Sequence, residues 1–311
     1  MVKKMTSSSS YRILKIVAGA IVAASCLAVT TSGLSAASKT PASSGPAFVG
    51  PIRYEGTLAG AHALEVSARA QAMRDTLDFP VGSERVARHV RDGFQQIEYD
   101  EVEELDADGR ILAVAQFDSS GRLRAAVRFD AHARPSRPMG RDAATKAAQR
   151  AATAAGLPAT GALRTESDPA SEGWTVHWAR EVEGVPVRGD ETRVHVWPDG
   201  RVQSLSRAEH RLAARPARPL DRTQAAAIAD QYLDGWFAQS SSGYSLQGMN
   251  LEWAAPNGAF NANAPDDPQA ACRLAWVVNV KPTGAASDYL RLITMYIDAG
   301  DGSLLGGDFV E

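Results

Sequence analysis

Two histidines and a tryptophan occupy alternate positions of two predicted strands, and they are the residues best placed for chemistry. If a helix covers the face that carries Trp174 and Val176, then His177, His195 and Trp197 share the opposite, open face. Neighbouring imidazoles can bind a metal or titrate near neutral pH, although no third ligand is in view. Outward polar positions, or an aromatic and histidine-lined surface for a partner, are the other interpretations. We take these three residues as a tentative binding surface and expect no metal and no catalytic residue.

A run of acidic residues is the second candidate for chemistry. The carboxylates are Glu98, Asp100, Glu101, Glu103 and Glu104, all in one strand-like stretch. Paired carboxylates can act as a general acid and base. We expect them instead to form a solvated face opposite the basic residues Arg122, Arg124 and Arg128.

The recognisable motifs of catalysis and cofactor binding are absent from this sequence. It has no H-E-x-x-H helix, no G-x-S-x-G elbow, no phosphate-binding loop and no G-x-G-x-x-G. The segments D-A-D-G-R-I-L-A-V-A-Q-F (106–117) and D-A-G-D-G-S (298–303) are interpreted as turns rather than calcium loops. We therefore expect a protein that is not an enzyme and has no cofactor, and we leave residues 51–131 undecided in this respect.

The N-terminal 37 residues resemble a secretory signal. Four basic residues precede an apolar run from Ile16 to Val29, and small residues follow at Ala36 and Ala37. The run is short for a membrane-spanning helix, which favours a cleaved signal. An uncleaved anchor is the alternative, and it would be the only contact with a membrane. We expect a secreted or cell-envelope protein, with residues 38–50 as a disordered tether.

Charge and cysteine content after cleavage limit the possible partners and the possible disulfides of the mature protein. The mature chain keeps 33 − 4 = 29 basic and 36 acidic residues, a net charge of −7, which argues against a nucleic-acid partner. Of the two cysteines only Cys272 remains, so no intramolecular disulfide can form. Cys272 precedes an apolar strand and is expected to be a small buried residue.

Hydrophobic periodicity predicts an N-terminal unit at residues 51–131. A helix begins near Ala61, a second short helix follows Ser83, and a three-stranded meander spans residues 94–130. In its last hairpin, Phe117 is expected opposite Leu123, and Ala115 opposite Ala125. Ala113 would then face Val127.

Two further units, residues 139–213 and 220–311, follow the same design. Each has a helix and then strands, and Asp221 with Gln224 forms a capping box at the start of the second helix. Aligning G-W-T-V-H-W with A-W-V-V-N-V places Trp174 on Trp276, which we expect to be equivalent core residues. The predicted fold class is α+β, with tandem modules that each pack a helix on an antiparallel meander.

The most patterned stretch of the chain carries a resemblance to a known family. The stretch from Glu181 to Leu205 resembles the fungalysin/thermolysin propeptide domain, through the matching positions Gly184, Pro186, Val187, Gly189, His195, Asp199, Gly200, Arg201 and Val202. Residues 220–311 resemble the PepSY domain that follows it in such propeptides. The repeats of YcdB-like exported proteins fit nearly as well. Gly184, Pro186, Gly189, Asp199 and Gly200 are structural positions in this interpretation.

The resemblance implies a binding function rather than a catalytic one. Propeptides of this family help their metallopeptidase to fold and block its active cleft. No peptidase domain follows in this sequence, so any inhibition or folding assistance is expected to act in trans on an exported metallopeptidase. A generic cell-envelope or extracellular binding module with another partner is the alternative.

Cleavage of the signal is directly testable. We predict that the exported protein begins near Ala37 or Ser38, because small residues follow the apolar run there. The intact mass of protein recovered from the culture medium or cell envelope measures this. A mass that includes Met1 would contradict cleavage and favour the anchor.

Overall fold

The structure is a computed structural model, and it describes residues 52–92, 97–132, 135–168, 172–237, 243–257, 259–260 and 269–310. The predicted signal (1–37) and tether (38–50) lie outside the described residues. Within those ranges, no helix has both the length and the apolar character needed to cross a membrane.

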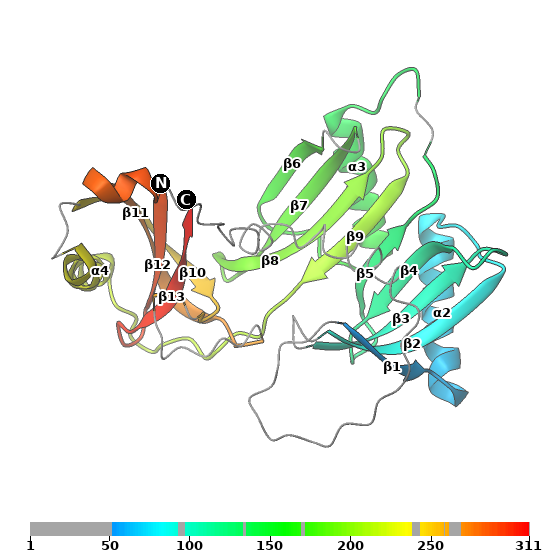
Figure 1. Ribbon diagram of the computed structural model, residues 1–311, viewed down its shortest axis with the longest axis horizontal. Helices are drawn as coiled ribbons and strands as arrows, with labels where there is room; N and C mark the ends of the chain where they lie inside the picture. The colour runs from blue at the N-terminus through cyan, green and yellow to red at the C-terminus, as the bar shows by residue number, and fades with distance from the viewer. Residues whose placement is uncertain are drawn as a thin grey trace, which may run out of the picture.

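The described residues form thirteen strands and three α-helices, in an order that repeats a helix followed by four strands (Figure 1). After β1 (Arg53–Thr57) come α2 (Gly60–Leu77), β2 (Glu84–Asp92), β3 (Ile97–Leu105), β4 (Ile111–Phe117) and β5 (Leu123–Arg128). Next are α3 (Arg141–Ala154), β6 (Leu163–Asp168), β7 (Gly173–Val182), β8 (Val185–Val196) and β9 (Val202–Ala208). The last group is α4 (Arg222–Phe237), β10 (Gly243–Ala254), β11 (Arg273–Thr283), the short 3-10 helix η3 (Gly284–Asp288), β12 (Leu292–Asp298) and β13 (Leu304–Val310).

These strands are hydrogen-bonded into one mixed sheet, so the predicted fold class of tandem helix-on-meander modules is wrong. The strand order is β1-β2-β3-β4-β5-β9-β8-β10-β11-β12-β13, with β7 attached to β8 and β6 to β7. Two pairings join the groups: β5 with β9, antiparallel, and β8 with β10, parallel, at Val187 and Trp253. The physical reason is that a meander leaves unpaired backbone groups along its outer strands, and here neighbouring groups satisfy them mutually.

The N-terminal region also differs from expectation, because residues 84–92 form strand β2 rather than a short helix. All nine residues of β2 are paired with β3, from Glu84 opposite Leu105 to Asp92 opposite Ile97. Pairing along the whole length of β3 outweighs the weak helical spacing of Val86 and Val90.

A bulge shifts the register of the β4–β5 hairpin. Phe117 lies opposite Leu123 as predicted, but the register moves between Gln116 and Phe117. Ala115 therefore faces Ala126, and Ala113 faces Arg128, so the other two predicted pairs are wrong. A one-residue shift exchanges the two faces of a strand, and it turns Arg128 toward the helix side, where it is buried.

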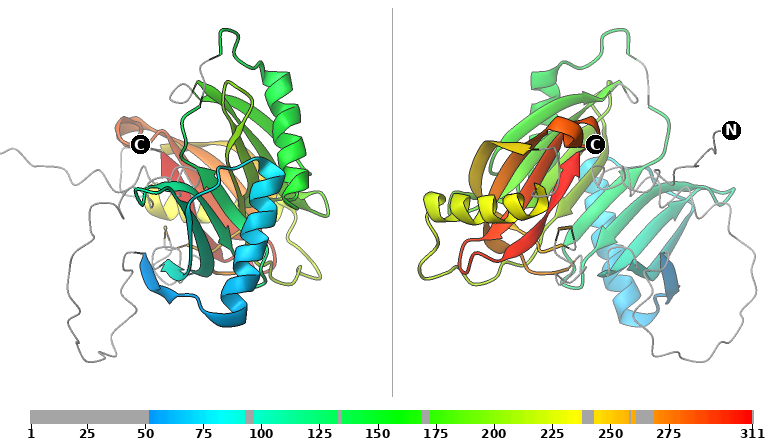
Figure 2. Two further views of the ribbon diagram at one scale, coloured as in Figure 1. Left: turned by 90° about the vertical axis from the view of Figure 1, so that its right-hand side faces the viewer. Right: turned by 60° about the vertical axis from the view of Figure 1, so that its left-hand side comes forward.

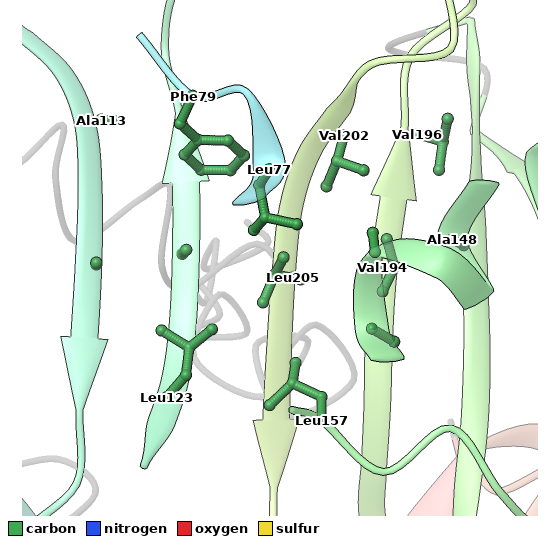
Figure 3. Close-up of a cluster of buried hydrophobic side chains, with 14 of the residues drawn as sticks. Leu77, Phe79, Ala113, Leu123, Ala148, Leu157, Val194, Val196, Val202 and Leu205 are labelled. Atoms are coloured by element: carbon green, nitrogen blue, oxygen red, sulfur yellow. The ribbon is translucent and has the colours of Figure 1, made fainter. Parts of the chain in front are cut away.

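One hydrophobic core serves the first two groups of elements. Figure 3 shows Leu77 of α2, Leu123 of β5, Ala148 of α3, Val194 of β8 and Leu205 of β9 in the same cluster. Helices α2 and α3 lie along the same side of the sheet and touch each other (Figure 2). The segments 51–131 and 139–213 thus share their buried interior.

The C-terminal group has its own core beneath α4. The cluster includes Ala229 and Leu233 of α4 with Val278 and Met295 of the strands. The predicted capping box is confirmed, since the backbone N–H of Gln224 donates to Asp221 Oδ1 at 2.8 Å and the N–H of Asp221 donates to Gln224 Oε1 at 2.9 Å. This box satisfies donors that the first turn of α4 leaves free.

Trp174 and Trp276 hold equivalent positions in the second and third groups. Trp174 Nε1 donates to the carbonyl of Met139 at 2.8 Å, and Trp276 Nε1 donates to the carbonyl of Leu220 at 2.9 Å. Both acceptors lie two residues before a helix begins. The predicted equivalence is confirmed, although both side chains are half-buried rather than fully buried.

We predict that the two tryptophans respond alike to substitution. Changing either to Phe keeps the ring contact and removes the indole hydrogen bond, which should cost about 1–2 kcal/mol of unfolding free energy. Changing either to Ala should cost about 3 kcal/mol, at the low end for large aromatic residues because both are partly exposed. Urea unfolding of the four variants measures this. A near-neutral result at one site alone would contradict the equivalence.

Candidate functional site

His177 and His195 share one face of the sheet as predicted, but that face is not open. Thr175 is paired with His195 and His177 with Arg193, so both imidazoles lie opposite the side packed against α3. Only 6% of each histidine is exposed. His177 Nδ1 lies 3.0 Å from Glu191 Oε2, and His195 Nδ1 lies 2.9 Å from Thr175 Oγ1. Burial lowers the pKa of His195, and the expected open surface is therefore wrong for these two residues.

Trp197 is also buried, and it lies in an internal joint. Its ring stacks on His132 at a centroid distance of 4.8 Å. The guanidinium carbons of Arg128 and Arg201 lie 5.5 Å and 5.1 Å from the ring centre. Arg201 also bonds Asp130 at 3.0 Å. The W-P-D-G-R turn is thus docked onto the end of β5 by stacking, cation–π contact and an ion pair.

Asp199 and Gly200 shape this turn. The Asp199 carboxylate accepts the backbone N–H of Arg201 at 3.0 Å, and Gly200 N–H donates to the Trp197 carbonyl at 2.9 Å. Gly200 has φ +91°, and a Cβ there would lie 2.6 Å from Met139 Cε. A glycine is therefore favoured both by its backbone conformation and by its neighbour.

The G-V-P-V-R-G motif is where the second and third groups of strands meet. Val182 and Val185 close a tight turn whose two central residues have positive φ, +53° at Glu183 and +75° at Gly184. After Pro186 the strand leaves β7, and Val187 is paired with Trp253 of β10. The motif positions thus build an intramolecular joint.

The exit from the joint is shaped by Gly189 and anchored by Arg188. Gly189 has φ +83°, and a Cβ added there would meet no atom within 4 Å. Glycine is therefore favoured at this position by the backbone conformation and not by lack of space. Arg188 Nε donates to Tyr296 Oη at 2.7 Å, and Arg188 Nη1 lies 3.2 Å from Glu252. These contacts tie β8 to β10 and β12.

A buried carboxylate holds the segment that links the second group to the third. Asp190 accepts hydrogen bonds from Arg180 Nη1 at 2.9 Å and from the backbone N–H of His210 at 2.9 Å. Arg180 Nη1 also donates to the His210 carbonyl at 2.8 Å. Cys272, beside this segment, is fully buried as predicted, and burial raises its thiol pKa to about 12.

Four of the five acidic residues of β3 are buried rather than solvated, so that expectation is wrong for Asp100, Glu101, Glu103 and Glu104, whereas Glu98 is exposed. Glu104 lies 2.7 Å from Arg85 and 3.3 Å from Arg74, and Glu103 lies 3.1 Å from Arg88. Their partners come from α2 and β2 and not from the predicted basic residues of β5. The expectation failed because residues 84–92 were predicted to be helical. As a strand, β2 places the arginines of one of its faces along β3.

Asp100, also in β3, bridges two histidines. Its carboxylate lies 2.9 Å from His62 Nε2 of α2 and 3.0 Å from His89 Nδ1 of β2. The hydrogen bond to Asp100 raises the pKa of His89. The bridge therefore strengthens at mildly acidic pH, where the imidazole is charged, and it fastens the start of α2 to the sheet.

Glu101 is the most strongly perturbed carboxyl of this group. It accepts a hydrogen bond from Gln116 Nε2 at 2.8 Å, and burial raises its pKa to about 7. A carboxyl with this pKa can exchange protons near neutral pH. Only 3% of the residue is exposed, however, so it has no room for a substrate and we interpret it as structural.

The open strand edges are the remaining candidates for a functional surface. β1 is short and bulged, and β10, bulged after Leu246, meets β8 at Trp253. The outer side of β13 is covered by Asn257, whose backbone N–H donates to Leu305 and whose side chain pairs with both backbone groups of Gly307. In contrast, β6 is paired with β7 at six consecutive positions without a bulge. In the part of the chain that the structure describes, β6 has no strand on its other side.

A groove of about 390 Å³ runs between β6 and the first two turns of α3. Its lining residues are Arg141, Asp142, Thr145, Lys146, Leu163 and Thr165. Figure 1 shows β6 at the outer end of its group of strands, with α3 behind the same group. This groove, with the β6 edge, is the candidate site, and the sequence interpretation missed it because strand edges are assigned only by tertiary pairing. Among the described residues, no group of three His, Cys, Asp or Glu side chains is arranged to hold a metal ion.

Comparisons with known proteins add little. No protein-family model matches the chain, and no curated protein matches it. Among solved structures, the C-terminal domain of YpeB from Bacillus megaterium is similar at a TM-score of 0.42 and 12% identity, covering 79% of this chain and 97% of that one. A likeness at this level gives no basis for transferring a fold or a function.

The burial of Glu101 predicts a pH dependence of stability. Its pKa is about 7 in the folded protein against an ordinary value of 4.5, so between these pH values the folded protein keeps a proton that the unfolded chain releases. Stability from this group is thus lost as pH rises from about 4.5 to about 7. Glu101→Gln cannot ionise and should flatten that decline.

Melting temperatures measured across this pH window test the prediction. Glu181→Gln, at an exposed position of β7, is the matched control and should keep the wild-type slope. Parallel curves for Glu101→Gln and the wild type would show that Glu101 does not titrate in this range.

Proposed function

We propose that this chain is an exported, non-catalytic binding protein that receives an extended segment of a partner on an open strand edge. The observation that carries the proposal is β6, an unbulged edge strand beside a groove in an otherwise joined sheet. An unpaired strand edge presents a row of N–H and C=O groups that an extended peptide can complete.

The placement of the ionisable residues supports binding rather than catalysis. His177, His195 and Glu101 are buried and paired within the sheet. Asp190 and Glu104 are likewise engaged by arginines. These groups hold strands and segments together, which leaves backbone groups and the groove side chains as the means of recognition.

An exported metallopeptidase is the partner that we favour. The support is the resemblance of the stretch from Glu181 to Leu205 to peptidase propeptides, in which Gly184, Pro186, Gly189 and Gly200 recur as shape-giving positions. In this chain those positions form joints of the sheet, so they determine how its strands are arranged. Binding would act in trans, either by blocking the peptidase or by assisting its folding.

A paired sheet also suits a protein that must survive contact with a peptidase. Proteolysis requires a locally unfolded, extended segment. Strands β7 and β8 are paired from Trp174 and Val196 to Ala179 and Glu191, and again at the turn that Val182 and Val185 close. This pairing keeps most of the motif stretch out of an active cleft as substrate.

We predict that the mature protein lowers the activity of an exported metallopeptidase of the same organism without being cleaved efficiently. Peptide hydrolysis titrated with the protein measures inhibition, and gel analysis of the mixture measures cleavage. Gly200→Val should weaken the effect, because it strains the turn that docks on β5 and meets Met139.

Full activity of every such enzyme at a large molar excess would contradict the inhibitor role. Refolding yield of the denatured peptidase with and without the protein then tests the folding-helper role. If neither assay responds while another exported protein is retained specifically, the generic binding module is the correct interpretation.

A further inference from the structure

We infer that the groove between α3 and β6 binds an extended, acidic segment of a partner protein as an added strand. The inference rests on the proposed function and deepens it, because it names the edge and the chemistry of the segment. It is carried by the backbone of β6, by the unpaired basic side chains of α3 and by an exposed apolar residue at one end of the groove.

The backbone of β6 is set up for strand addition. Its pairing with β7 runs without a shift from Leu163 opposite Trp178 to Asp168 opposite Gly173, so its free side is regular. Thr145 Oγ1 lies 3.0 Å from Thr165 Oγ1, which ties α3 to the strand and fixes the width of the groove. A preformed edge of this kind needs little reorganisation when a segment binds.

The charge of α3 selects an acidic segment. The helix carries Arg141, Lys146 and Arg150 against one acid, Asp142, whereas α4 at the matching position carries one base and two acids. Within the described part of the chain, neither Arg141 nor Lys146 forms an ion pair. Because the whole chain has a net charge of −3, this basic face is a local exception that favours an acidic partner segment.

The groove also fixes where the acidic residue stands. Leu163 is 54% exposed and borders the groove, two residues before Thr165. Alternate residues of an added strand point to the same face. The segment that fits therefore has an apolar residue beside Leu163 and an acidic residue two positions along, below Lys146 and Arg141.

Binding of a defined probe tests this inference. The probe is a short fluorescein-labelled peptide in which valine and glutamate alternate at every second position, separated by threonines. A second probe carries lysine in place of glutamate. Fluorescence anisotropy with the full mature protein should show saturable binding of the glutamate probe, weakened by salt, and at least about tenfold weaker binding of the lysine probe.

Charge-reversal variants locate the site. Lys146→Glu and Arg141→Glu should each weaken binding of the glutamate probe by about tenfold. Arg150→Glu is the matched control, because it makes the same charge change on the same helix at an exposed position outside the groove lining. Circular dichroism melts of all three variants confirm folding. Equal weakening by the control would show a general charge effect and overturn the inference.

N-methylated probes test the strand geometry. Methyl groups on alternate backbone nitrogens block one edge of an extended peptide, so of two such probes in opposite phase only one should lose binding. Loss in neither probe, or no binding of the unmodified glutamate probe, would overturn the inference.

The metallopeptidase assay separates this inference from the proposed function. If Lys146→Glu binds and inhibits a peptidase as the wild type does, the basic groove side chains do not recognise the partner and this inference is wrong, while the proposed binding of a peptidase stands. If the wild type affects no exported partner while the glutamate probe binds as described, the site stands and the proposed partner is wrong.

Discussion

The pairing of strand edges between successive groups of elements is the constraint on which the rest of the structure depends. β5 pairs with β9, and Val187 of β8 reaches Trp253 of β10. The first pairing places α2 and α3 over one shared core, and the second creates a small apolar cluster around Cys272 and Leu274. Among the described strands, β6 is left with a free edge and a regular pairing to its one neighbour, β7.

Buried charges support the same joints. Arg128 and Arg201 hold Trp197 against the end of β5, and Asp190 holds the linker through His210 and Arg180. Breaking a buried ion pair leaves an uncompensated charge and is costly, although such a pair adds little net stability compared with apolar packing. Their main effect is therefore on geometry, since each network is satisfied in one arrangement of the strands.

The motif positions and the candidate groove are different parts of the molecule. Gly184, Gly189 and Gly200 give the backbone its turns at the joints, while His177, His195 and Trp197 fill the interior. The groove at β6 lies on the outer edge of the second group; His177 is paired with Arg164 of β6, but on the face of the sheet opposite α3, whereas the groove lies on the α3 side. The motif positions thus shape the sheet and do not line the groove that we propose as the contact.

The sequence by itself determined the local elements, because their signals act over a few residues. The capping box at Asp221 and Gln224, the three helices α2, α3 and α4, the turns that end in Asp-Gly or Ser-Gly, and the equivalence of Trp174 and Trp276 were all predictable from spacing. The burial of Cys272 was predictable from its apolar neighbours.

Tertiary structure alone decided which strand edges meet and what the polar residues do. The strand at 84–92 and the bulge at Gln116 follow from how neighbouring strands pair, and the burial of Glu101 and Glu104 follows from how the sheet and α2 pack. Alternation along a strand shows that two faces differ, but it does not show what covers each face. His177 and His195 were placed on the correct face and given the wrong environment for this reason, and the open edge of β6 became visible only once the pairing of the other described strands was known.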